Sequence, residues 1–222
     1  YNAKTGDLMS GGNGGAIYVT GGNKNEHLVV SNSVFTNNTA QNYGGAIFLA
    51  EKSYLELVDT NITGNTSNGQ FGGGIHVSAG STLDVIAKTQ DVMIYGNYSS
   101  GSSNDISMEE NSTVNLISYD GHNFIIGTIY KVMNTKHSTI YAINKDTNKP
   151  ANFYFKSNPG NIDTTRKDSV GTVNIYVYGK NADANDIFDN IKLNLSQNTS
   201  LSISDGKIND ISLESLNVTN GG

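Results

Sequence analysis

The chain has 222 residues, a formal net charge of −6, and no cysteine or tryptophan. Asn, Gly, Ser and Thr number 31, 25, 23 and 19 and make up about 44% of the chain, whereas charged residues make up 15%. So many poor helix formers exclude a helical bundle, and the Val, Ile, Leu, Phe and Tyr content is too high for a disordered linker. The composition therefore predicts an all-β, turn-rich chain of roughly one domain.

The distribution of charge excludes several classes of partner. The lysines and the single arginine, Arg166, form no basic stripe that could neutralise phosphates, so we expect no nucleic-acid partner. The sequence contains no apolar run of about 18 residues, so we expect no membrane-spanning helix. The lack of cysteine fits an exported protein, and both ends lie inside patterned sequence, which favours a fragment of a longer, processed protein.

A repeat of about 30 residues begins near the N-terminus. Its first motif is Gly14-Gly15-Ala16-Ile17, which recurs as Gly44-Gly45-Ala46-Ile47, as Gly73-Gly74-Ile75, and in degenerate form as Asn104-Asp105-Ile106. A later motif, Phe35-Thr-Asn-Asn38, recurs as Ile62-Thr-Gly-Asn65 and Ile94-Tyr-Gly-Asn97. Between them lies a second pair of alternating apolar residues, such as Leu55 and Leu57. Each unit thus predicts three short strands separated by polar turns.

A three-strand unit of this length cannot bury its inner face alone, but copies stacked on one another can. We therefore predict a right-handed, single-stranded parallel β-helix with three faces and about six to eight rungs. Ile17, Ile47, Ile75 and Ile106 should form one interior column. Asn38, Asn65 and Asn97 should form a ladder of stacked amides, and the glycine pairs should form tight corners. An antiparallel sandwich with strands at similar spacing is the alternative.

The regularity fades after about residue 118. We predict regular rungs over 1–129, an irregular insertion over 130–170, and further rungs over 171–222, all in one continuous domain. Within the insertion, 138–143 and 151–156 look like strands around 144–150, which predicts a hairpin or a long-looped rung.

The motifs at 14–17, 44–47 and 35–38 resemble the paired GGA(I/L/V) and FxxN repeats of chlamydial polymorphic outer membrane (Pmp) proteins. The resemblance covers roughly residues 10–130 well and the remainder loosely. It implies the passenger domain of an autotransporter, displayed at the cell surface as an adhesin. The chain departs from the pattern because Ile replaces Phe at 62 and 94 and because cysteines common in chlamydial members are missing.

Parallel β-helices also carry polysaccharide lyases and glycoside hydrolases, which need clustered or facing carboxylates. Glu56 and Asp84 lie between inward residues, one rung apart, and are interpreted as part of a solvated strand face. The other charges look scattered, so we expect no enzyme, no catalytic residue and no cofactor. A lyase or hydrolase would instead show carboxylates with Lys or Arg in one groove.

No metal ligand set stands out either. The densest acidic cluster, 183–189, lacks the glycine and the distal glutamate of a calcium loop, which leaves a weak Ca²⁺ site or an ordinary polar turn. The four histidines have no metal-ligand spacing, and His76 and His122 are expected at the surface.

Binding remains as the expected function, because insertions in repeat proteins often form binding loops. The candidate binding hairpin comprises Tyr141, Lys145, Asp146, Lys149, Phe153 and Tyr154. Its alternative role is a small satellite core. We expect an extracellular adhesin fragment whose partner is a host-cell or microbial receptor, a matrix protein or a glycan, with self-association also open. A purely structural stalk and a carbohydrate-active β-helix are the alternatives.

Overall fold

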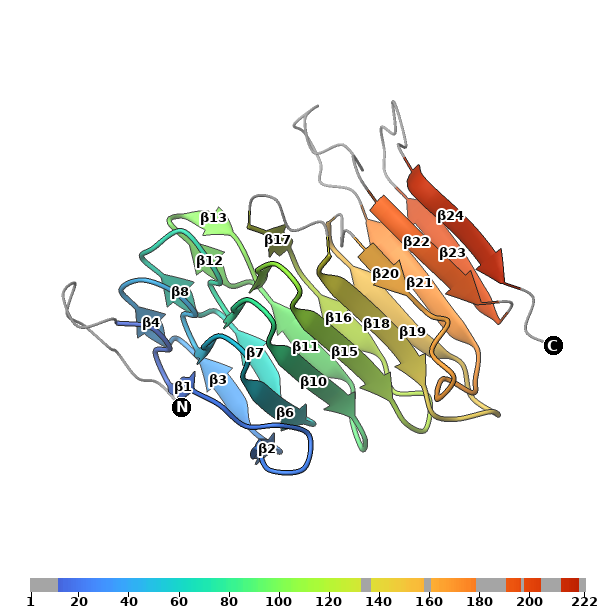
Figure 1. The fold of residues 1–222 in the computed structure, drawn as a ribbon, viewed down its shortest axis with the longest axis horizontal. Helices are drawn as coiled ribbons and strands as arrows, with labels where there is room; N and C mark the ends of the chain where they lie inside the picture. Colours follow the sequence, from blue (N-terminus) through green and yellow to red (C-terminus); the bar gives the residue numbers. More distant parts are fainter. Residues whose placement is uncertain are drawn as a thin grey trace.

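The computed structural model describes residues 12–132, 137–157, 161–178, 191–196, 198–204 and 213–219. Its strands stack one behind another along the long axis of the molecule, from β1 near the N-terminus to β24 near the C-terminus (Figure 1). Nearly every strand pairs in parallel with its equivalent one rung away; among the strands of the described residues, only β12 and β13 pair antiparallel. The fold is therefore a β-solenoid, and the antiparallel sandwich is wrong.

Three sheets form the walls of the coil. The five-stranded sheet contains β1 (Ile17–Val19), β5 (Ile47–Leu49), β9 (Ile75–Val77), β14 (Ile106–Met108) and β17 (Ile129–Lys131). The eight-stranded sheet contains β2 (Leu28–Ser31), β6 (Tyr54–Val58), β10 (Thr82–Ala87), β15 (Thr113–Ser118), β18 (Thr139–Asn144), β20 (Asn161–Asp163), β22 (Ile191–Ser196) and β24 (Leu213–Thr219). The seven-stranded sheet contains β3 (Val34–Thr36), β7 (Asn61–Thr63), β11 (Val92–Tyr95), β16 (Phe124–Ile126), β19 (Ala151–Phe155), β21 (Val173–Tyr178) and β23 (Thr199–Ser204).

A fourth, short sheet was not expected. It contains β4 (Thr39–Ala40), β8 (Thr66–Ser67), β12 (Tyr98–Ser99) and β13 (Ser102–Ser103). These strands lie where the chain passes from the seven-stranded to the five-stranded sheet, a stretch we call the ladder corner (Figure 1). The first rungs are thus four-sided, because this corner is itself hydrogen-bonded from rung to rung.

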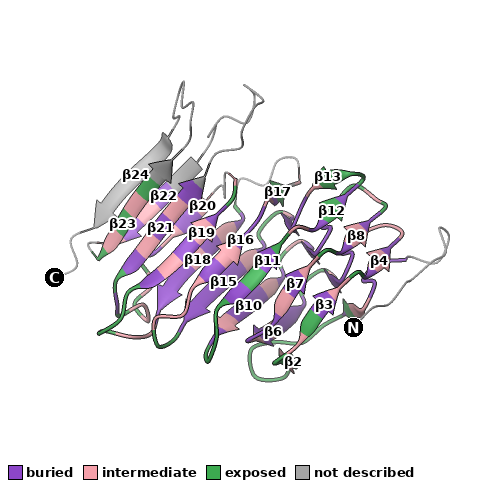
Figure 2. Cartoon of the chain, turned by 180° about the vertical axis from the view of Figure 1, so that it is seen from behind, coloured by how far each residue is buried: buried purple, intermediate pink, exposed green. Residues whose placement is uncertain are grey.

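The predicted interior column is confirmed. Ile17 pairs with Ile47, Ile47 with Ile75, and Ile75 with Ile106. The column continues to Ile129, one rung further than predicted. Side chains alternate between the two faces of the strands, and the inward ones form the buried core; in β5, β9 and β14 the outward position is buried as well (Figure 2).

The predicted asparagine ladder is also confirmed. Asn38 donates its backbone N–H and its Nδ2–H to Oδ1 of Asn65, at 2.9 and 2.8 Å. Asn65 donates in the same way to Asn97, at 3.0 and 2.8 Å. All three side chains are fully buried. The ladder ends on Asp105, whose Oδ1 accepts the corresponding pair of bonds from Asn97 at 2.7 and 2.8 Å.

The glycine pairs form corners as predicted, with one shift in register. Gly14 and Gly44 have positive φ, and a Cβ on Gly45 would lie 2.0 Å from the carbonyl oxygen of Gly73. In the third copy the positive φ belongs to Gly72, and Gly45 N–H donates to Gly72 O. The equivalent pair is therefore 72–73, and Gly74, which was predicted as part of the pair, takes the place of the alanine.

The hairpin prediction over 138–156 is wrong, and its long-looped-rung alternative is right. Strand β18 pairs with β15 and β20 in the eight-stranded sheet, whereas β19 pairs with β16 and β21 in the seven-stranded sheet. The two strands are consecutive sides of one rung, and 145–150 is the turn between them. The later rungs are irregular for another reason than a hairpin. Within the described ranges, no strand after β17 joins the five-stranded sheet, so these rungs lack that side.

Candidate functional site

The six residues of the predicted binding hairpin do not form one site. Phe153 is fully buried in the core and stacks on Phe124, with ring centroids 5.2 Å apart. Tyr154 points out of the seven-stranded sheet and stacks on Tyr176 at 4.8 Å. Tyr141 lies on the outer face of the eight-stranded sheet, under the guanidinium of Arg166. The chain turns a corner between β18 and β19, which lie in different sheets, so the outer faces of these two strands point in different directions.

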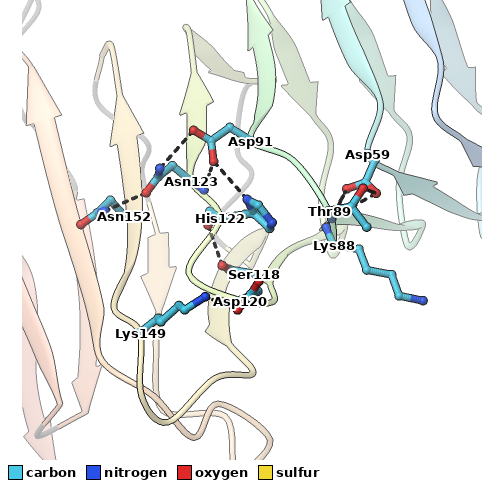
Figure 3. Close-up of polar contacts among 10 residues, drawn as sticks. All are labelled: Asp59, Lys88, Thr89, Asp91, Ser118, Asp120, His122, Asn123, Lys149 and Asn152. Carbon is cyan, nitrogen blue, oxygen red and sulfur yellow. Dashed lines mark hydrogen bonds and ion pairs between the residues drawn. The ribbon is translucent and has the colours of Figure 1, made fainter.

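The turn between β18 and β19 carries the other three predicted residues, and both of its lysines form ion pairs. Lys145 Nζ lies 2.8 Å from Asp168 Oδ2. Lys149 forms an ion pair with Asp120, one rung back (Figure 3). The hydrogen bond and charge of Lys149 lower the pKa of Asp120, and those of Asp120 raise the pKa of Lys149. Asp146 accepts the backbone N–H of Asn148, which shapes the exposed tip of the turn.

A column of polar side chains crosses this same corner and was not predicted. Asp91 accepts both the backbone N–H and the side-chain N–H of Asn123, at 2.8 and 3.1 Å, and also faces His122 at 3.5 Å (Figure 3). Asn123 Oδ1 in turn accepts Nδ2–H of Asn152 at 2.7 Å. The column continues through Asn174 to the hydroxyl of Ser200.

A buried carboxylate organises the preceding turn. Asp59 accepts the backbone N–H groups of Lys88 and Thr89 and the Thr89 hydroxyl, at 2.6 to 3.0 Å (Figure 3). Burial opposes ionisation of Asp59, but these hydrogen bonds outweigh it and lower its pKa. Asp59 therefore acts as a fixed support for the next rung's turn.

The outer face of the eight-stranded sheet holds more organised charge than the sequence indicated. Glu56 and Asp84 are neighbours one rung apart, as predicted, but Asp84 is only 6% exposed and does not lie on a solvated face. Tyr54 Oη and Asn115 Nδ2 each donate to it at 2.5 Å. Burial and the bond to Asp84 raise the pKa of Tyr54.

Arg166 joins this cluster through a hydrogen bond to Asn115. It reaches back from the turn between β20 and β21 to donate to Asn115 Oδ1 at 3.0 Å, and it makes two bonds of 2.9 Å to Asp168. The charges on this face are therefore clustered rather than scattered, contrary to expectation. Both Asp84 oxygens accept protein hydrogen bonds, and the guanidinium is paired with Asp168, so the cluster is satisfied by its own members.

The prediction for His76 is wrong in one respect. It points outward, between the inward Ile75 and Val77, but it is only 1% exposed, because aromatic rings cover it. Phe48 and Tyr43 stack on the imidazole with centroids 5.1 and 5.2 Å away. The alternation of apolar and polar residues along a strand predicts whether a side chain points inward or outward. It does not predict whether side chains of neighbouring rungs bury an outward one.

The imidazole of His76 joins two polar groups. Its Nδ1 lies 2.7 Å from Ser107 Oγ and its Nε2 lies 3.2 Å from Glu109 Oε1. The bond to His76 is the main cause that lowers the pKa of Glu109. Serine, histidine and glutamate thus stand in sequence, but Ser107 is fully buried and presents no hydroxyl to solvent. The group holds the outer surface of the five-stranded sheet together.

The described residues contain neither a metal-binding group of side chains nor a membrane-spanning helix. In those ranges, no three His, Asp or Glu side chains are placed to hold a metal ion. None of the described residues belongs to a helix long and apolar enough to cross a membrane. The candidate calcium cluster at 183–189 lies outside the described residues.

Comparison with known proteins relates a short segment of the chain to a family of repeats. Residues 32–50 match the model of the Chlamydia polymorphic membrane protein repeat. This segment runs from the turn before β3, through Asn38 and the ladder corner, to the end of β5. No curated protein and no solved structure gave a match. The repeat match and the β-solenoid together fit a passenger domain of the Pmp type, which is a class of surface protein.

Proposed function

We propose that this chain is the adhesive part of a surface-displayed passenger, and that it acts through non-covalent contacts. The observation that carries the proposal is the Pmp-type repeat at 32–50, which forms one complete ladder corner of the solenoid. A passenger has to present a surface at a distance from its anchor. A stack of hydrogen-bonded rungs meets this need, because each rung contacts only its neighbours and the coil can extend without a larger core.

The contact region that we favour is the turn at 145–150 together with the turn at 164–172. These are long turns at the corner between the eight- and seven-stranded sheets, and Lys145 and Asp168 join them. The turn at 145–150 is exposed from residue 147 to residue 150. Loops held by a rigid scaffold are where binding residues concentrate.

Deletion of the whole segment 138–156 is unsuitable as a test, because it would remove two core strands. A surface variant, Lys145→Ser with Asp146→Ser and Lys149→Ser, leaves β18 and β19 intact. The matched control, Lys24→Ser with Glu26→Ser, alters an exposed loop at the other end of the coil. Circular dichroism should show that both variants fold.

The experiment measures binding of the labelled chain to epithelial cells, immobilised matrix proteins and a glycan array. We expect saturable binding that the triple variant reduces at least about tenfold, which corresponds to about 1.4 kcal/mol, and that the control leaves unchanged. Binding that survives the triple variant would place the contact elsewhere on the coil. A folded chain that binds none of these surfaces would reject the adhesin in favour of the structural stalk.

A further inference from the structure

The ladder corner contains an Asn-Gly pair on an exposed turn. Three such pairs occur in the sequence, Asn13-Gly14, Asn68-Gly69 and Asn220-Gly221, and the last lies outside the described residues. The turn at 68–70 directly follows β8 (Figure 1). Its first and last residues are exposed, and Gly69 between them is half-buried. The second pair is therefore open to water.

This turn is one residue longer than its equivalent in the preceding rung. The residues just before and just after it pair with Ala40 and Tyr43, so 68–70 stand opposite only 41–42. An extra residue on one of two paired segments makes that segment bulge. The side-chain amide of Asn68 makes a single exposed hydrogen bond, from Nδ2 to Gln41 Oε1 at 3.1 Å. Little in the neighbouring rung therefore holds the side chain of Asn68 in place.

The two described Asn-Gly pairs differ in the hydrogen bonding of the glycine N–H. Gly14 N–H donates to Tyr43 O at 2.9 Å, and Asn13 before it is half-buried. Gly69 N–H donates to no other residue in the described part of the chain, and Asn68 before it is exposed. The nitrogen of Gly69 is therefore free to react, whereas the nitrogen of Gly14 is held by the fold.

We infer that Asn68 is a site of spontaneous modification in the folded chain, at which the side-chain amide is lost and an isoaspartate or aspartate is formed. Gly69 N–H gives its proton to water or hydroxide, and the nitrogen bonds to Cγ of Asn68 while the bond from Cγ to Nδ2 breaks and ammonia leaves. Water then opens the resulting succinimide ring: opening at Cγ gives aspartate, and opening at the backbone carbonyl gives isoaspartate. Water is the only co-reactant, because the nucleophile and the electrophile are neighbours in one chain.

The packing of the corner requires the glycine that makes Asn68 reactive. A Cβ at position 69 would lie 1.9 Å from the carbonyl oxygen of Asn42, so a residue with a side chain does not fit there. Glycine also leaves the attacking nitrogen unhindered, because it has no side chain beside it. The close approach of two rungs and the susceptibility of Asn68 therefore have the same cause.

Formation of isoaspartate should loosen the ladder corner. It inserts the Cβ of residue 68 into the main chain, next to a glycine whose close packing leaves no room for a longer backbone. Gly69 O accepts the hydroxyls of Ser99 and Ser100 at 2.8 and 2.7 Å, so these bonds to the next rung should be lost. Each event also replaces a neutral amide by a carboxylate, which makes the net charge of −6 more negative. An aged chain should therefore carry a looser corner than a newly made one.

Peptide mapping of the folded chain after incubation in water labelled with heavy oxygen tests this inference. Ring opening leaves one oxygen of the water in the product, so label at position 68 reports the reaction. Label should accumulate at Asn68 at least about tenfold faster than at Asn13, a difference of about 1.4 kcal/mol in activation free energy. In urea the two pairs should react at the same rate, because the fold then protects neither. Asn68→Gln should stop the reaction at position 68, and Asn13→Gln, the matched control, should leave it unchanged.

Hydrogen exchange measures the consequence for the corner. The Ser100 amide, which donates to Ser67 O at 3.0 Å, should exchange faster in the aged wild type than in the aged Asn68→Gln variant. The inference is overturned if position 68 stays unlabelled in the folded chain while the unfolded chain reacts. It is also overturned if Asn13 reacts as fast as Asn68 in the folded chain. Labelled chain with unchanged exchange at Ser100 would overturn the loosening of the corner.

Discussion

The first rungs and the later rungs of this coil are stabilised in different ways. Up to β14, each rung has a ladder corner with glycine turns and a buried asparagine, and its core contains mainly Ile, Leu and Val. After that the corner disappears: only Gly127 and Thr128 separate Ile126 of the seven-stranded sheet from Ile129 of the five-stranded sheet. The largest fully buried side chains, Phe124, Phe153 and Phe155, all belong to this later part.

Asp105 marks the transition between the two parts. Its backbone occupies the place of Ala46 and Gly74 in earlier rungs, and its side chain accepts the last ladder bonds. Its second oxygen accepts Thr128 N–H at 2.7 Å, where the shortened chain passes. A coil can therefore lose one side without leaving the buried donors of the previous rung unpaired, provided that a carboxylate terminates the ladder.

Removal of an aromatic ring from the later part should have the largest effect. Phe153→Ala should lower the free energy of unfolding by about 3 to 5 kcal/mol, because it leaves a cavity against Phe124. Tyr154→Ala, one residue on and outside the core, should cost less than about 1.5 kcal/mol. Urea unfolding measures both. Equal costs would contradict the placement of Phe153 inside the coil and of Tyr154 on its outer face.

Removal of a ladder amide should have the next largest effect, and in the first part of the coil. Asn65→Ala takes away the acceptor of two Asn38 donors and should cost about 2 to 4 kcal/mol. Hydrogen exchange should show faster exchange at the Asn38 amide. Asn148→Ala in the exposed turn serves as the control and should change stability by less than about 0.5 kcal/mol. Slow exchange at Asn38 in the variant would show that the ladder is dispensable.

The junction between the two parts should respond to pH. Burial raises the pKa of Asp105, so its ionised form is disfavoured in the folded state. The wild type should therefore gain stability as pH falls from 7 through this raised pKa towards the ordinary value of about 3.9. Other carboxylates act in the opposite direction, so the comparison is made with Asp105→Asn.

Asp105→Asn removes the titration but places an amide N–H against Thr128 N–H, which should cost about 1 to 3 kcal/mol at neutral pH. The stability difference between wild type and variant should widen on acidification. A difference that is constant between pH 7 and pH 4 would contradict a raised pKa at Asp105.

The smallest effect is expected at the surface turn. Lys149→Ala removes an exposed ion pair with Asp120, and the midpoint of thermal unfolding should stay unchanged within experimental error. A clear fall in the midpoint would mean that the turn at 145–150 supports the later rungs instead of lying on them.

The sequence predicted what the repeat spacing determines. The column from Ile17 to Ile106 and the ladder from Asn38 to Asn97 follow from period-two alternation in copies of nearly equal length. The hairpin was wrong because two strands around a short polar turn look the same whether they pair with each other or with the rungs on either side. Asp84 and His76 were placed on the correct face, but their burial comes from side chains of neighbouring rungs, namely Tyr54 for Asp84 and Tyr43 and Phe48 for His76.

Other contacts had weaker sequence signals. Asp105 stood in the fourth copy of the glycine motif, where its departure from Ala and Gly could have indicated a new inward group. The contact of Arg166 with Asn115 joins residues 51 positions apart, and no local pattern reports it. The column from Asp91 to Ser200 was visible only as polar residues just before or at the start of strands, which turns also contain.

The asparagine ladder also has a direction. Asn38 donates to Asn65, Asn65 to Asn97, and Asn97 to Asp105, so the ladder bonds all run in the same direction, and Nδ2 of Asn65 and of Asn97 also donates back to the preceding rung. Aligned amide dipoles add, as peptide dipoles do in a helix, and their positive ends face the carboxylate. The row of amides therefore stabilises the negative charge of the Asp105 carboxylate at its end. Each additional asparagine rung on the N-terminal side would make that buried anion easier to hold, so the coil is electrically polar along its axis.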